Sequence, residues 1–205
     1  MYLARTPAIA RALYGSRLWR MPAEDDGGKS IHLTFDDGPI LDVTPWVLEQ
    51  LRAHQAKATF FCIGKNIEAN PDVFARVQAD GHTIGNHTWD HCNGRHTSLA
   101  DYVASVQRCQ PLTGSSLFRP PYGRLTRDQA RALNNDFTIV MWSVLSGDFD
   151  VRIDAERCTR NVLKHTEAGS IVVFHDSVKA WPRLRETLPK VLEHFSGLGY
   201  SFKGL

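Results

Sequence analysis

The sequence alternates between short apolar segments of strand composition and longer segments with helical periodicity, and this alternation limits the fold most strongly. Gly, Pro or paired polar residues follow the strand-like segments, and Thr, Ser, Asn or Asp precede many of the helical ones. Repeated strand–helix units favour a parallel sheet covered by its crossover helices. The expected strands are 31–35, 57–63, 82–86, 117–118, 137–142, 169–174 and 200–202, and the expected helices are 44–51, 70–81, 98–106, 126–133, 154–165 and 181–195.

This pattern predicts an α/β fold, a small (β/α) barrel of about seven strands, with an open doubly wound sheet as the alternative. Residues 1–30 are expected to form a helical extension and linker, and residues 31–205 the barrel domain. Pro189 should kink or interrupt the last helix. No Gly-x-Gly-x-x-Gly or phosphate loop follows a strand, so nucleotide binding is not expected.

Composition narrows the class of protein further. The 205 residues are 42% hydrophobic and 22% charged, which suits one domain with a substantial core. The formal net charge is only +2 and the basic residues are scattered, so no nucleic-acid partner is expected. No apolar run approaches the ~20 residues of a membrane span. No C-x-x-C pair occurs, and we expect four unpaired thiols, at Cys62, Cys92, Cys109 and Cys158.

The first twenty residues place four arginines among apolar side chains. They lack a continuous apolar stretch and a cleavage site, so they make a poor secretory signal, and a cytoplasmic location is expected from the sequence. We expect an amphipathic helix that packs on the domain. A basic helix on a membrane surface is the alternative. Residues 23–30 form a polar linker.

Two adjacent carboxylates, Asp36 and Asp37, follow the first strand and precede the Gly38-Pro39 turn. Carboxylates this close repel each other, and ionising both requires compensation. A metal ion on one and an arginine beside the other would supply it. The alternative is an ordinary Asp-rich turn.

Acidic, imidazole and guanidinium groups follow other strands at the same expected end, which in a (β/α) barrel holds the active site. The spacing His-x-x-x-His predicts two imidazoles on one side of a helical turn, and with one carboxylate they would form a metal site with open positions. The alternative is that exposed histidines have this spacing by chance. Two further histidines, His82 and His96, lie near this pair in the sequence and could be mistaken for ligands. We interpret His82 as structural, because it precedes its strand. The residues concerned are His87, His91, Arg119, Asp148 and His175.

Five ordered motifs resemble those of the polysaccharide deacetylases, carbohydrate esterase family four, the NodB-homology domain. The resemblance runs from about residue 31 to the C-terminus. The motifs are Thr34-Phe35-Asp36-Asp37-Gly38-Pro39, His87-Thr88-x-x-His91, Arg119-Pro120-Pro121-Tyr122-Gly123, Trp142-Ser143 through Asp148, and Val173-Phe174-His175-Asp176.

The resemblance implies a distorted (β/α) barrel, a bound divalent metal and hydrolysis of N-acetyl groups on amino-sugar polymers. It implies that Asp37, His87 and His91 bind the metal, expected to be zinc, with cobalt, nickel or iron as alternatives. Asp36 would be the base and Arg119 its cation. The N–H of Tyr122 would be the oxyanion donor, His175 the acid and Asp148 the group that orients it. Phe149, Val173, Pro120 and Trp142 would contact the substrate.

Two positions depart from the family pattern. Phe149 stands where the family often has Trp, and Leu145 where it often has an acidic residue. We therefore keep a hydrolase of another small amide or ester as an alternative, and a non-catalytic carbohydrate-binding relic as a weaker one. The expected partner is an N-acetylated glycan, peptidoglycan- or chitin-like, and a monomer is favoured. The family's usual substrates lie outside the cytoplasm, so the cell envelope is an alternative to the cytoplasmic location expected from the sequence.

Overall fold

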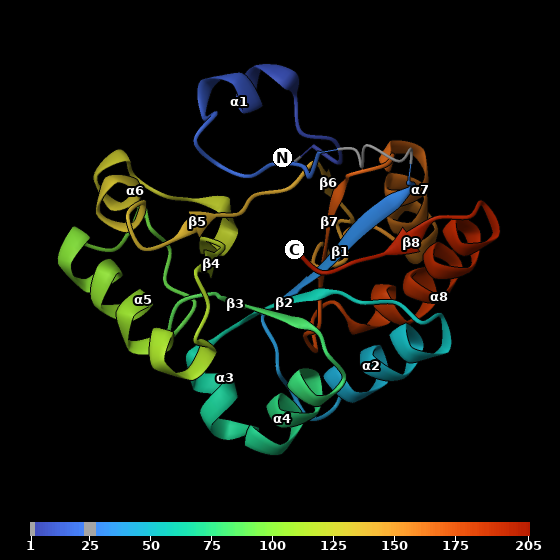
Figure 1. The fold of residues 1–205 in the computed structure, drawn as a ribbon, viewed down its shortest axis with the longest axis horizontal. Helices are drawn as coiled ribbons and strands as arrows, with labels where there is room; N and C mark the ends of the chain where they lie inside the picture. The colour runs from blue at the N-terminus through green and yellow to red at the C-terminus, as the bar shows by residue number, and fades with distance from the viewer. Residues whose placement is uncertain (1–2, 23–27) are drawn as a thin grey trace.

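The computed structural model describes residues 3–22 and 28–205. Seven parallel strands form one curled sheet in the order β5-β4-β3-β2-β1-β7-β6, and β8 pairs with the start of β1 (Figure 1). This curled half-barrel confirms the expected distorted (β/α) barrel of about seven strands. The strands are β1 Ser30–Asp36, β2 Thr59–Cys62, β3 Thr83–Asn86, β4 Leu117–Phe118, β5 Thr138–Ile139, β6 Val144–Leu145, β7 Ile171–His175 and β8 Ser201–Phe202.

Helices surround the outside of the curled sheet in Figure 1. Most follow their expected signals: Ser98 caps α5 and Thr126 forms a capping box at the start of α6. The helices are α1 Ala8–Leu13, α2 Thr44–Ala53, α3 Gly64–Ala69, α4 Pro71–Ala79, α5 Leu99–Thr113, the 3-10 turn η1 Pro121–Gly123, α6 Arg127–Leu133, α7 Ala155–His165 and α8 Trp181–Gly197.

Strand β1 is the centre of the main core. All seven of its residues are buried, and it pairs with β2 on one side and β7 on the other. The Phe35 ring stacks between Phe60 and Phe174, with centroids 5.1 Å and 5.9 Å away. Because the strand is fixed by neighbours on both sides, the carboxylates at its end are held on a rigid support.

The expected strand 137–142 is wrong in its extent. Only Thr138–Ile139 pairs as β5, and the chain then leaves it to form the unexpected short strand β6 beside β7. The apolar residues beyond β5, Val140 and Met141, are buried even so. The apolar composition of residues 137–142 therefore reflects burial inside the curled sheet, and it does not require one long strand.

The N-terminal segment closes the edge of the sheet between β5 and β6. Leu18 exchanges backbone hydrogen bonds with Ile139 and Met141 (2.9 and 2.7 Å), and Thr6 and Ala4 bond to the chain around β6 (2.9 and 2.8 Å). The expected packed amphipathic helix is wrong, because only Ala8–Leu13 is helical and none of its residues is buried. Met1, Tyr2 and most of the 23–30 linker lie outside the described residues.

Pro189 does not interrupt the last helix, contrary to expectation. Helix α8 continues from Trp181 to Gly197 with Pro189 inside it. Leu188, Val191 and Leu192 are fully buried around the proline. Packing of the apolar face against the sheet therefore offsets the one hydrogen bond that proline removes.

Two expectations from composition are confirmed within the described part of the chain. All four cysteines are unpaired thiols; Cys62, Cys109 and Cys158 are buried and Cys92 is half-buried. Among the described helices, none combines the length and the apolar character that crossing a membrane requires.

A buried carboxylate, Asp176, holds the turn that follows Asp36 and Asp37. Asp176 Oδ1 accepts the N–H of Gly38 (3.0 Å), and Oδ2 lies 2.5 Å from the hydroxyl of Thr44. Thr44 is the first residue of α2, and its hydroxyl also accepts the N–H of Ile40 (2.8 Å). A Cβ on residue 38 would lie 2.0 Å from Asp176, so only glycine fits there.

We expect Asp176→Ala to lower the free energy of unfolding by about 2–4 kcal/mol, because the buried N–H of Gly38 and hydroxyl of Thr44 lose their partner. Asp176→Asn keeps an acceptor and should cost less. Urea unfolding measures both, with the exposed Asp128→Ala on α6 as control. Equal losses in the Ala and Asn variants would contradict this role.

Burial raises the pKa of Asp176 to about 8, so the folded state binds a proton that the unfolded chain releases near pH 4. Stability should therefore fall as pH rises from about 4 to 8. Asp176→Asn should lack this contribution, which unfolding measured across that pH range would show.

Candidate metal and catalytic site

The register of the parallel strands gathers the expected site residues at one edge of the sheet. Asp36 and His175 are partners in neighbouring strands β1 and β7. Asn86 and Phe118 are partners in β3 and β4, so the following residues, His87 and Arg119, also lie side by side. Residues that are far apart in sequence therefore meet because parallel strands end together.

Asp37, His87 and His91 form a group that could hold a metal ion. Their ligand atoms all lie within 4.8 Å of one another. Asp37 Oδ1 is 3.2 Å from His91 Nε2 and 3.8 Å from His87 Nε2. Burial alone would raise the pKa of Asp37, but His91 and the neighbouring imidazoles hold it below its usual value. The carboxylate is therefore ionised, as a metal ligand must be.

The hydrogen bonding of His87 fits a metal ligand. Its Nδ1 lies 2.7 Å from the carbonyl of Arg119, which can only accept, so Nδ1 carries the proton. Burial lowers the pKa of His87 to about 4, and the ring is neutral. The Nε2 lone pair of His87 thus faces the ionised Asp37. A cation bound between them would remove the repulsion between the lone pair and the carboxylate. Such an Nδ1–H to carbonyl bond is a frequent orienting contact of metal-bound histidines.

A loop, not the expected helical turn, brings His87 and His91 together. Residues 87–91 have no helical structure, and both Thr88 and His91 have positive φ angles, 65° and 59°. The side chain of Asn86 fixes the start of this loop, because its Oδ1 accepts the N–H of Thr88 (2.9 Å) and its Nδ2 donates to Val106 (2.9 Å). The spacing therefore identified the pair but not the conformation that joins it.

Asp36 faces Arg119, whose side chain is fully buried. Arg119 Nη1 donates to Asp36 Oδ1 at 2.7 Å and to the hydroxyl of Thr34 at 2.7 Å. Its Nε and Nη2 donate to the carbonyls of Val140 (3.4 Å) and Met141 (3.0 Å). The guanidinium also lies 4.1 Å over the ring of Phe61.

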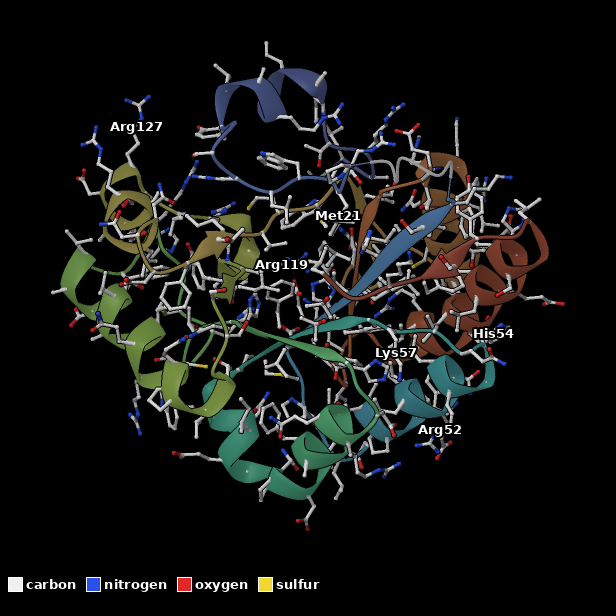
Figure 2. All side chains as sticks on the ribbon, viewed as in Figure 1. Met21, Arg52, His54, Lys57, Arg119 and Arg127 are labelled. Atoms are coloured by element: carbon white, nitrogen blue, oxygen red, sulfur yellow. The ribbon has the colours of Figure 1, made fainter. Side chains whose placement is uncertain are left out.

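These contacts fix the cation in the interior, as Figure 2 shows for Arg119 near the middle of the molecule. Burial lowers the pKa of Arg119 from its usual value, and the charge of Asp36 opposes that change. The sequence expectation of one metal-binding and one arginine-paired carboxylate thus has a geometric counterpart: Asp37 faces the histidines and Asp36 the arginine.

His175 and Asp148 make a second charged pair at this edge. Asp148 Oδ1 lies 2.8 Å from His175 Nδ1, and Oδ2 accepts the backbone N–H of the same residue (2.7 Å). Burial alone would lower the pKa of His175, but the carboxylate of fully buried Asp148 raises it to about 10. Ser146 donates to Asp148 Oδ1 (3.0 Å) and fixes the carboxylate in turn.

The remaining predicted residues lie around these groups. The Tyr122 ring is 4.6 Å from His91 and its φ is 59°; the hydrogen bonds of its turn are donated by Gly123 and Arg124, not by the N–H of Tyr122. Phe149 packs edge-on to His175 at 5.2 Å. Pro120 and Val173 are buried, and Trp142 is half-buried where a Cβ on Gly123 would lie 2.5 Å from its ring.

Sequence reasoning missed several supporting residues. Asn66 donates to the backbone carbonyl of Asp37 (2.7 Å), and Thr34 and Ser146 contact the two charged pairs. Thr34 and Ser146 lie within the recognised motifs, so their positions could have indicated them. Asn66, on α3, carries no such signal. His82, buried, accepts the N–H of Ala58 (3.2 Å), in agreement with a structural role.

Residues 23–140 match the model of the polysaccharide deacetylase family. A peptidoglycan-N-acetylglucosamine deacetylase of Bacillus cereus is 36% identical over 72% of this chain and 56% of its own length. A chitooligosaccharide deacetylase of Azorhizobium caulinodans is 40% identical over 72% of this chain and 73% of its own. The chain thus spans about half the length of the Bacillus cereus relative.

A solved structure of a peptidoglycan N-acetylglucosamine deacetylase, in complex with a naphthyl-substituted N-oxidanyl-benzamide, has the same fold. It superposes with a TM-score of 0.86 at 31% identity over 98% of this chain and 95% of the other. Fold, motif order and sequence identity agree, and the family match covers more than half of the chain. The chain belongs to the polysaccharide deacetylase family.

Proposed function

We propose that this chain is a metal-dependent hydrolase that removes N-acetyl groups from N-acetylglucosamine units of a peptidoglycan- or chitin-like glycan and releases acetate. The observation that carries the proposal is the placement of two separate charged pairs, Asp36–Arg119 and Asp148–His175, beside the Asp37–His87–His91 group. Amide hydrolysis needs a base, an acid and an electrophile close together, and these groups fit the three tasks.

Asp36 is the proposed base. When bound by Asp37, His87 and His91, a divalent cation, zinc in this proposal, supplies Lewis acidity and an acidified water. Asp36 lies next to Asp37 in the chain, and its carboxylate would accept a proton from the attacking water. Arg119 holds the carboxylate in place, since the guanidinium is fully buried and donates to Asp36 Oδ1.

Stabilisation of the oxyanion is assigned to the N–H of Tyr122. The left-handed conformation of this residue and the hydrogen bonds of its turn support the assignment, because Gly123 and Arg124, not Tyr122, donate those bonds. One such donor often lowers the barrier by about 3 kcal/mol. The apolar groups expected to contact the acetyl group and sugar are Phe149, Val173, Pro120 and Trp142.

His175 is the proposed acid. With Nδ1–H donated to Asp148, the imidazolium presents its other N–H to the departing nitrogen of the amide. Proton transfer to that nitrogen lets the C–N bond break, and acetate and a free amine leave. Leu145, which stands at an often acidic family position, lies within β6 and has no part in this pair.

The names of the two relatives support an N-acetylglucosamine substrate and differ on the polymer, peptidoglycan or chitooligosaccharide. A hydrolase of another small amide or ester with the same residues is the second candidate. We propose a monomer, and the cell envelope as the site of action if peptidoglycan is the substrate.

Purified protein should release acetate from N-acetylglucosamine oligosaccharides or from peptidoglycan fragments when a divalent metal is present. His175→Ala should lower kcat by about 10²–10⁴-fold, because acid catalysis commonly supplies that factor. Acetate release across a panel of glycans and of simple acetate esters measures this. Hydrolysis of the simple esters alone would favour the second candidate.

Asp36 and Asp37 should respond differently to the same substitution. Asp36→Asn should retain one divalent metal per chain and lower kcat by about 10²–10⁴-fold. Asp37→Asn should lower metal affinity itself, since a charged ligand is lost. Elemental analysis and titration with Zn²⁺ after chelator treatment test this, with Asp42→Asn as a nearby control. Equal loss of metal in both variants would contradict the assignment.

Asp148→Asn should shift the alkaline limb of the pH–rate profile to lower pH. Asp148 raises the pKa of His175, so His175 stays protonated to higher pH in the wild type, and the neutral amide removes that support. Metal content should not change. Activity between pH 6 and pH 10 measures the limb, and an unchanged limb would show that another group sets the protonation of His175.

A further inference from the structure

Positive charge is concentrated at the start of the chain. Residues 1–20 contain Arg5, Arg11, Arg17 and Arg20 and no acidic residue, whereas the whole chain has a net charge of +2. The other 185 residues therefore carry a net charge of −2. The acidic residues 24–26 follow in the sequence and lie outside the described residues. This uneven distribution distinguishes the N-terminal segment from the rest of the protein.

The same segment exposes its apolar side chains. Leu3 is 60%, Ile9 70%, Leu13 73% and Tyr14 45% exposed. No residue of α1 is buried, although its sequence, Ala-Ile-Ala-Arg-Ala-Leu, is mostly apolar. We call these four side chains the α1 patch. Four of the exposed large hydrophobic residues of the described chain thus lie within twelve consecutive positions. An exposed apolar cluster of this kind is typical of an interaction surface.

The α1 patch is held firmly in this position. The carbonyl of Ala4 accepts from Leu145 and the N–H of Thr6 donates to Ser143, which attaches the segment before α1 to the chain around β6; the backbone bonds of Leu18 attach the segment after it to the chain around β5. In Figure 1 α1 lies outside the sheet, between α6 and α7, where no other helix covers the strands. The fold therefore fixes α1 at both ends while its apolar side chains point away from the core.

Arginines lie within and beside the stretch that carries the α1 patch, and one of them contacts it. Arg5 is 58% exposed, and the guanidinium of Arg17 lies 4.5 Å over the Tyr14 ring. Arg11 is half-buried, and its Nε has no hydrogen-bond partner among the described residues. Among the described residues, Glu167 is the acidic side chain that pairs with arginines of this segment, with Arg20 at 2.5 Å and Arg5 at 3.7 Å.

We propose that the α1 patch docks on the surface of an anionic lipid bilayer. Exposed Leu, Ile and Tyr side chains beside arginines are the composition of segments that lie in a membrane interface, with the apolar side chains among the acyl chains and the cations at the headgroups. A symmetric contact between two copies fits less well, because it would bring the arginines of one copy against those of the other.

Vesicle co-sedimentation of the full chain tests the proposal. The wild type should bind vesicles of phosphatidylcholine with 30% phosphatidylglycerol at least tenfold more tightly than pure phosphatidylcholine, and added salt should weaken binding. Ile9→Gln/Leu13→Gln should lose at least tenfold, and Arg5→Gln/Arg17→Gln should lose the preference for anionic lipid. Leu198→Gln, at a position 52% exposed beyond α8, is the matched control and should bind like the wild type.

Three outcomes would overturn the proposal. These are no binding to anionic vesicles, equal loss in the Leu198→Gln control, and self-association by analytical ultracentrifugation that Ile9→Gln/Leu13→Gln abolishes. The last result would assign the patch to a second copy of the chain. Because α1 contributes no residue to the candidate site, acetate release from a soluble oligosaccharide should be unchanged in the double variant, so this test is independent of the proposed function.

Discussion

The buried ion pair between Arg119 and Asp36 is the interaction on which the arrangement of the site depends. Removing two charges from water is costly, and such a pair is stable only when further hydrogen bonds satisfy it. Here the chain around two strands supplies them: Thr34 from β1, and the carbonyls of Val140 and Met141 beyond β5. The guanidinium from the end of β4 therefore ties together strands that are far apart in the sequence, and the backbone carbonyls fix where it points.

Three carboxylates at this edge each have a cationic or imidazole partner. Asp36 pairs with Arg119, Asp148 with His175, and Asp37 faces two imidazoles. Asp176 has no such partner, and burial raises its pKa until it serves as a largely neutral clamp on the Gly38–Thr44 turn. The division follows from geometry: Asp36 and His175 are the last residues of β1 and β7, whereas Asp37 and Asp176 lie beyond the strand ends, and the positive φ of Asp37, 85°, turns the chain there.

Sequence reasoning succeeded where a property is local. Apolar alternation, caps and turn residues located most strands and helices, and Asp36, His87, Arg119 and His175 stand at or just after the ends of the strands that carry them. It failed where distant contacts decide. The start of the loop joining His87 to His91 is fixed by Asn86, whose side chain is held in place by the distant carbonyl of Val106, and Pro189 is tolerated because α8 packs on the sheet. The N-terminal helix leaves its apolar side chains exposed because the flanking backbone, and not the helix, makes the contacts.

The sequence by itself determined the class of fold, the order of the motifs and the residues with the chemistry for metal binding and proton transfer, because these depend on residue type and spacing. The tertiary structure alone decided which carboxylate faces which partner, which nitrogen of His87 carries the proton, and how the N-terminal segment attaches. Those features depend on strand register and on atoms brought together from distant parts of the chain, and a difference of a few ångströms changes which groups interact.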